Sequence, residues 1–89
     1  MSNYEIWTLE DCPACETALT SLKSELKSGK VKRIHCSEKT DPDAKLLRKA
    51  EKMGIDGFPT VLKHNTDGSY CEVSADDLGK TIKCFPKKV

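Results

Sequence analysis

The residues whose types and spacing could do chemistry lie in the segment Cys12-Pro13-Ala14-Cys15 of this 89-residue chain. Two cysteines three positions apart at the start of a helix have sulfurs close enough to form a disulfide. The first sulfur would lie beside unpaired backbone N–H groups and the positive end of the helix dipole, which favours the thiolate that attacks disulfides. We therefore predict Cys12 as the nucleophile and Cys15, one turn into the helix, as the resolving thiol.

The elements around the pair matter because the Cys-x-x-Cys spacing by itself is weak evidence for a redox motif. Among shuffled chains with five cysteines, roughly a quarter would contain such a pair. The apolar run Tyr4–Leu9 predicts a buried strand. The pattern from Pro13 to Gly29 predicts a helix, with proline in the first turn, where its missing N–H costs little. Val31–Cys36 predicts a second strand, so strand, helix and strand would form a parallel pair with a right-handed crossover. Cys12 would then lie between the first strand and its helix.

The middle of the chain predicts a helix, a strand and a hairpin. Asp41 would be the N-cap of a helix that ends at Gly54, and Thr60–His64 would be the next strand. Asn65–Gly68 predicts a hairpin turn, because Asp-Gly supplies the positive φ that such turns need. Ser69–Val73 would be the antiparallel return strand.

The last segment predicts a third helix. Ser74 with Asp77 three residues on makes a capping-box-like start, and Leu78, Ile82 and Phe85 would form the buried stripe. The order of elements is then β-α-β-α-β-β-α. We predict an α/β protein with a four-stranded mixed sheet flanked by three helices.

Composition and charge are those of one ordinary globular domain over residues 1–89. Hydrophobic residues make up 37% of the chain, with too few apolar runs for a membrane span and too much hydrophobic periodicity for disorder. The net charge of +1, with lysines alternating with acidic residues, gives no reason to expect nucleic-acid binding. The first residues lack the basic and apolar regions of a secretory signal, so we expect a cytoplasmic protein. We also expect a monomer.

Three segments resemble glutaredoxins and their relatives in the thioredoxin superfamily. They are Cys12-Pro13-Ala14-Cys15, Gly57-Phe58-Pro59-Thr60 and the stretch Ser74–Leu78. The predicted order of elements also matches that family over nearly the whole chain. The resemblance implies a thioredoxin-like fold, a single glutaredoxin-like domain, and a thiol-disulfide oxidoreductase that reduces protein or glutathione-mixed disulfides by a dithiol mechanism.

The same resemblance implies roles for the residues around the pair. Pro59 is expected to be cis and to face the sulfurs, so that Pro13, Ala14 and Pro59 support the active site. The backbone of Phe58 would pair with an extended substrate. The implied substrate-binding residues are Phe58, Thr60, Asp76 and Asp77.

The exchange reaction itself needs no metal or organic cofactor. The expected partners are a disulfide-containing protein substrate and an electron donor, either glutathione as co-substrate or a reductase. The chain departs from typical glutaredoxins at Ala14, where they carry tyrosine, and at Val73-Ser74, where they carry Gly-Gly, so both donors stay open. Glu10 and Asp11 place negative charge before Cys12 and oppose its thiolate by like-charge repulsion.

The alternative to an enzyme is a non-catalytic thioredoxin-fold module that binds a partner beside Pro59 and uses its cysteines as a redox-sensitive clip. A zinc site is disfavoured, since the other cysteines and the histidines show no second paired spacing. Cys36, Cys71 and Cys84 are interpreted as buried structural thiols, with a regulatory disulfide at Cys71 or Cys84 as the alternative. His35 and His64 are interpreted as strand or surface residues.

Overall fold

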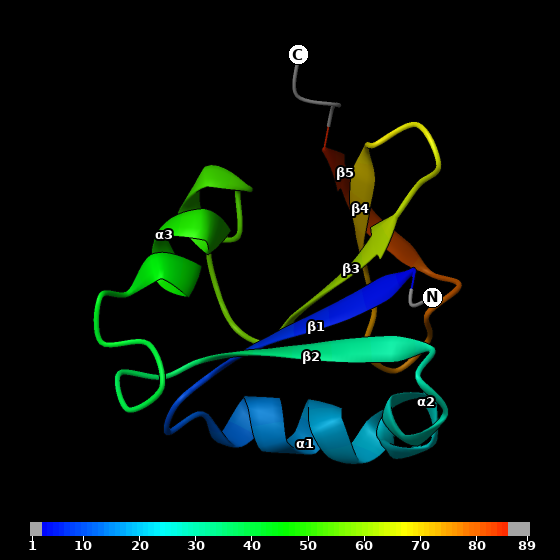
Figure 1. The fold of residues 1–89 in the computed structure, drawn as a ribbon. Coiled ribbons are helices and arrows are strands. Elements are labelled where there is room, and N and C mark those ends of the chain that lie inside the picture. Colours follow the sequence, from blue (N-terminus) through cyan, green and yellow to red (C-terminus); the bar gives the residue numbers. More distant parts are fainter. Residues whose placement is uncertain (1–2, 86–89) are drawn as a thin grey trace.

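The computed structural model describes residues 3–85, which contain eight helices and strands joined by loops (Figure 1). They are β1 (Tyr4–Leu9), α1 (Pro13–Ser21), α2 (Lys23–Ser28), β2 (Val31–Cys36), α3 (Lys45–Lys52), β3 (Thr60–His64), β4 (Tyr70–Val73) and β5 (Thr81–Phe85). The bounds of β1, β2 and β3 coincide with the strands predicted from the apolar runs.

The strands form one mixed sheet in the order β2-β1-β3-β4-β5. β1 and β2 are parallel, and α1 and α2 make the predicted crossover between them. β3 is antiparallel to β1, and β4 and β5 continue the sheet in antiparallel fashion. The predicted hairpin turn joins β3 to β4: the Asn65 N–H donates to the Ser69 carbonyl over 2.8 Å, and Gly68 has a φ of 92°.

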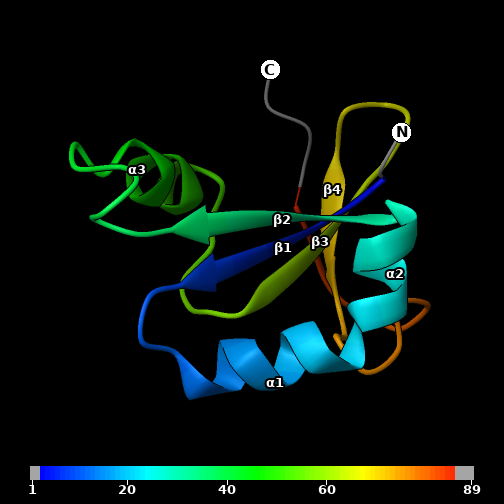
Figure 2. The ribbon, with the colours of Figure 1, turned by 60° about the horizontal axis from the view of Figure 1, so that its bottom comes forward.

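Helices cover both faces of the sheet, with α1 and α2 on one face and α3 on the other (Figure 1, Figure 2). The buried residues on the α1 side are Ile6, Ala18, Leu22, Val31, Val61 and Val73. Those on the α3 side are Trp7, Cys36, Ala50, Ile55 and Leu62. Neighbouring residues such as Ile6 and Trp7 therefore serve opposite faces, as the alternation of a strand buried on both sides requires.

The prediction of a four-stranded sheet closed by a final helix is wrong, and with it the thioredoxin-like arrangement that the prediction implied. Thr81–Phe85 is a fifth strand, paired antiparallel with β4. Ile82, expected in a buried stripe, is 58% exposed. The segment is rich in β-formers, and pairing with β4 satisfies backbone groups that would otherwise form an open edge of the sheet.

The residues expected to start that helix form a loop instead. The Ser74 N–H donates to the Lys80 carbonyl over 3.0 Å, which closes the loop, and the Asp77 N–H donates to the Ser74 carbonyl over 3.3 Å. Ala75 and Leu78 pack against the core on the α1 side. The capping residues thus make turn hydrogen bonds, and the apolar residues between them cover the sheet without a helix.

The two other predicted helices are present with different bounds. The helix from Pro13 is interrupted at Leu22, which separates α1 from α2 before Gly29 ends the second helix in a left-handed conformation. The helix expected from Asp41 starts at Lys45, because Ala44 adopts a left-handed φ of 54°. Within residues 3–85, no helix has the length and apolar character needed to cross a membrane.

Candidate redox site

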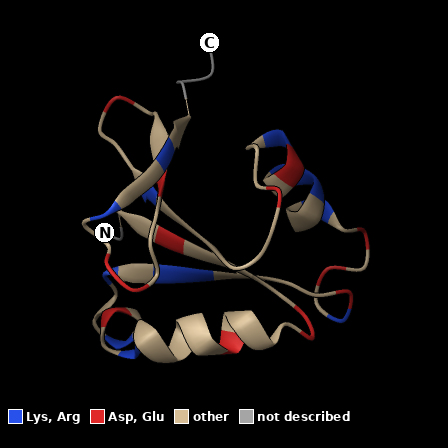
Figure 3. Cartoon of the chain, turned by 180° about the vertical axis from the view of Figure 1, so that it is seen from behind, with Lys and Arg blue, Asp and Glu red and all other residues tan. Residues whose placement is uncertain are grey.

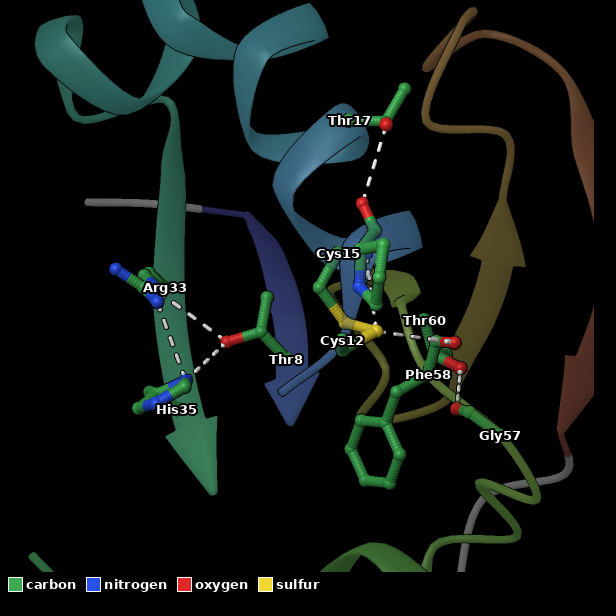
Figure 4. Close-up of a disulfide and its surroundings, with 10 residues drawn as sticks. Thr8, Cys12, Cys15, Thr17, Arg33, His35, Gly57, Phe58 and Thr60 are labelled. Carbon is green, nitrogen blue, oxygen red and sulfur yellow. Dashed lines mark hydrogen bonds between the residues drawn. A yellow bond between two sulfur atoms is a disulfide. The ribbon is translucent and has the colours of Figure 1, made fainter. Parts of the chain in front are cut away.

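Cys12 and Cys15 are joined by a disulfide at the N-terminus of α1, where the sequence predicts them (Figure 4). Cys12 is the N-cap, with extended backbone at φ −121° and ψ 97°, and Pro13 is the first helical residue. The Cys15 backbone N–H donates to Cys12 Sγ over 3.1 Å, as an N-cap side chain should accept. The helix start therefore directs a donor at the sulfur that would carry negative charge once the disulfide is reduced.

The two sulfurs differ in their access to solvent. Cys15 is 2% exposed and belongs to the core, whereas Cys12 is half-buried. Pro13 and Ala14, between them, are exposed. A disulfide substrate can thus approach Cys12, with Cys15 behind it.

The Phe58-Pro59 segment lies beside the pair, as expected from the resemblance. The peptide bond between Phe58 and Pro59 is cis. The Phe58 carbonyl oxygen lies 4.0 Å from Cys12 Sγ, although 46 positions separate the two residues (Figure 4). The Phe58 side chain packs against the apolar cluster on the α3 side, so it is the backbone of this residue that meets the sulfur.

The three other residues expected to bind substrate have different surroundings. Thr60 is 5% exposed, and its hydroxyl donates to the Gly57 carbonyl over 2.7 Å, which holds the loop before β3. Asp76 and Asp77 are exposed in the loop that follows β4. Among the hydrogen bonds and ion pairs of residues 3–85, none links either aspartate to Cys12 or Cys15; the Asp77 carboxylate accepts from the Gly79 N–H over 3.0 Å.

A shallow hollow lies directly beside Cys12. It is lined by Asp11, Cys12, Pro13 and Glu16. Asp11 has a left-handed φ of 55°, which aspartate tolerates better than most residues. Two of the four lining residues, Asp11 and Glu16, are acidic, so one of the two acidic residues that precede Cys12 lines the hollow beside it.

A second pocket of about 350 Å³ adjoins this hollow through Asp11, at the carboxyl ends of the parallel strands β1 and β2. Its acidic lining residues are Glu10, Asp11, Glu38 and Asp41. They belong to the loop between β1 and α1 and to the loop between β2 and α3, and Figure 3 colours the acidic residues of the chain red. Sequence reasoning missed Glu38 and Asp41 as lining residues, although parallel strands bring the residues after Leu9 and after Cys36 to one edge of the sheet.

No cluster of three or more metal-ligating side chains is present within the described part of the chain.

A buried threonine organises a polar cluster on the α1 side of the sheet. Thr8 is 0% exposed, and its hydroxyl lies 2.8 Å from His35 Nδ1 and accepts from Arg33 Nε over 3.4 Å (Figure 4). Thr8 and His35 are direct partners in the β1–β2 register. His35 is therefore a strand residue, as interpreted, but one that pairs with a buried hydroxyl.

Comparison with known proteins leaves this site to be interpreted from its own geometry. No protein-family model, curated protein or solved structure matches the chain. The resemblance to glutaredoxins rests on the segments quoted above, and the five-stranded sheet departs from the fold that it implied.

The remaining cysteines divide into one thiol and one disulfide. Cys36 is buried with a free thiol, as interpreted from the sequence. Burial, and secondarily the Asp41 carboxylate, raise the pKa of the Cys36 thiol above its ordinary value. The interpretation of Cys71 and Cys84 as structural thiols is wrong, because the two form a disulfide between β4 and β5. The alternative of a disulfide at Cys71 or Cys84 is confirmed as far as the bond itself, but the pairing of the two residues with each other was not predicted, because residues 81–85 were expected to be helical.

Proposed function

We propose that this chain is a thiol-disulfide oxidoreductase that reduces protein or glutathione-mixed disulfides through Cys12 and Cys15. The observation that supports it most is the asymmetry of the pair: an accessible sulfur at a helix start, bonded to a buried sulfur one turn behind it. A dithiol exchange enzyme needs one sulfur that substrate can reach and one that only the mixed disulfide can reach.

The reaction begins with the reduced pair. The Cys12 thiolate forms a bond to one sulfur of the substrate disulfide, and the other substrate sulfur leaves as a thiolate and takes up a proton. The Cys15 thiolate then attacks Cys12 Sγ, releases the second substrate thiolate and forms the Cys12–Cys15 disulfide. Two electrons pass from the cysteine pair to the substrate, and two thiols of glutathione or of a reductase return them.

The surrounding groups have distinct parts in these steps. The Cys15 N–H, 3.1 Å from Cys12 Sγ, stabilises the attacking thiolate together with the helix dipole. The Phe58 carbonyl oxygen lies 4.0 Å from the same sulfur. It can accept a hydrogen bond from the Cys12 S–H group when the reduced pair is protonated. Asp11 and Glu16 line the approach to Cys12, so we expect exchange to be faster with target disulfides in neutral or basic surroundings than with those in acidic surroundings.

The test compares the wild type with single cysteine variants in two assays, reduction of insulin and reduction of a hydroxyethyl disulfide–glutathione mixture. Cys12→Ser is expected to lower both rates by about a hundredfold or more, because the nucleophile is removed. Cys15→Ser is expected to lose insulin reduction and to accumulate a mixed disulfide on Cys12. Cys36→Ser, which changes a buried thiol outside the pair, serves as the matched control and should keep both rates.

Equal rates for the wild type and Cys12→Ser would overturn the proposal. If Cys12→Ser and Cys15→Ser also retained affinity for a disulfide-bearing partner, the chain would be a binding module instead of an enzyme.

A further inference from the structure

The Cys71–Cys84 disulfide joins two residues that lie directly opposite each other in β4 and β5. Such a pair on neighbouring antiparallel strands projects to the same face of the sheet. β5 is the edge strand of the sheet, and its residues 81–84 are all exposed. A thiol from solvent can therefore approach this disulfide without any rearrangement of the core.

The two sulfurs of this disulfide have unequal surroundings. Cys84 is exposed on the edge strand, whereas Cys71 is half-buried. The Asn65 side-chain amide donates to Cys71 Sγ over 3.7 Å. Lys63 of β3 lies directly opposite Cys71 in the register, and is exposed on the same face. An N–H donor and an ammonium group both stabilise a thiolate at Cys71, and a more stable thiolate leaves faster in exchange.

From this asymmetry we propose that Cys71–Cys84 is a second thiol-disulfide exchange site, in which low-molecular-weight thiols attack Cys84 and Cys71 is the leaving group. The incoming thiolate forms a bond to Cys84 Sγ, the bond between Cys84 and Cys71 breaks, and its electron pair goes to Cys71 as a thiolate. A second thiol molecule attacks the sulfur of the first and frees Cys84. Two electrons thus reduce Cys71–Cys84, and the two small thiols become a disulfide.

This site is independent of the Cys12–Cys15 pair. Cys71 is opposite Lys63, and Lys63 is opposite Tyr4, the first residue of β1. Cys12 follows the other end of β1, whose six residues span about 17 Å. The two disulfides lie toward opposite ends of the strands and cannot exchange within one molecule while the sheet is intact.

The experiment uses the full chain carrying Cys12→Ser and Cys15→Ser, so that only the second disulfide reacts. The protein is mixed with reduced glutathione, quenched with acid at short times and mapped by peptide mass spectrometry. Glutathione is expected on Cys84 at about ten times its level on Cys71. Adding Lys63→Gln should slow adduct formation by about threefold, while Lys32→Gln, an exposed lysine on the opposite edge strand, should leave it unchanged.

The proposal is overturned if glutathione attaches mainly or equally to Cys71, or if Lys63→Gln and Lys32→Gln react at the same rate. It is also overturned if the disulfide stays intact at glutathione concentrations that reduce Cys12–Cys15 in the wild type. If the doubly substituted chain fails to fold, the same peptide mapping on the wild type shows whether glutathione attaches to Cys84 or to Cys71. Because the variant lacks the first pair, failure here is distinguishable from failure of the proposed oxidoreductase activity.

Discussion

Phe85 lies against Gly54 so closely that a Cβ atom at Gly54 would be 2.7 Å from Cε2 of the ring. Gly54 follows α3 with a φ of 85°, and Phe85 is the last residue of β5. Tyr70 of β4 stacks on the same ring at 5.0 Å between centroids, and its hydroxyl donates to the Met53 carbonyl over 2.7 Å. The turn after α3 is therefore attached to both strands of the β4–β5 hairpin.

Gly54→Ala is expected to destabilise the protein by about 2–4 kcal/mol. A left-handed alanine costs roughly 1–2 kcal/mol, and displacing the Phe85 ring adds about 1–2 kcal/mol. Gly29→Ala is the matched control, since Gly29 has a φ of +84° but nothing within 4 Å of a Cβ atom. Urea unfolding should therefore show a loss of about 1 kcal/mol for the control. Equal losses for the two variants would mean that the Phe85 contact does not restrict position 54.

Ala44→Gly is expected to stabilise the protein by about 0.5–1 kcal/mol. Ala44 precedes α3 with a left-handed φ of 54°, which glycine adopts without the steric cost of a Cβ atom. Ala50→Gly, in the buried interior of the same helix, should instead destabilise by about 1 kcal/mol or more. The opposite signs can be read from urea midpoints, and a loss of stability in Ala44→Gly would contradict the left-handed conformation.

Asp11→Asn is expected to speed alkylation of reduced Cys12 by iodoacetamide at neutral pH by about threefold. Removing the carboxylate beside the sulfur takes away like-charge repulsion, while asparagine keeps the tolerance for the left-handed φ. The acceleration should shrink in high salt. Asp43→Asn removes a carboxylate in the loop before α3 and should not change the rate. A similar acceleration in this control would contradict a specific repulsion between Asp11 and Cys12.

Cys36 is expected to make stability fall at alkaline pH. Burial and the Asp41 carboxylate raise the pKa of this thiol above 9.0, so the folded state keeps it neutral where the unfolded chain already ionises. The unfolded state is then favoured as the pH rises above 9.0, and the loss continues up to the folded pKa. Cys36→Ala should lack this part of the alkaline decline in urea unfolding. If the free energies of unfolding of the two proteins fell in parallel above pH 9.0, the proposed role of Cys36 would be contradicted.

Local patterns in the sequence were sufficient for the elements nearest the chemistry. The apolar runs at Tyr4–Leu9 and Val31–Cys36, the proline after Cys12 and the Asp-Gly turn each act within a few residues, so their structures follow from neighbours in the chain. For the same reason the placement of Cys12 at a helix start was predictable. The break at Leu22 and the later start of α3 were not, because helix ends depend on small differences between local conformations.

The last strand and the second disulfide were decided by tertiary structure. The spacing of Leu78, Ile82 and Phe85 suits a helix, and Thr81–Phe85 also suits a strand, so the short segment is ambiguous by itself. Its conformation depends on the free edge of β4, on Cys71 opposite Cys84, and on the Phe85 site beside Gly54. Sequence patterns of this chain thus determined the placement of Cys12 and Cys15 and the two strands β1 and β2 on either side of them, whereas only long-range packing, which joins residues far apart in the chain, could choose between helix and strand over Thr81–Phe85.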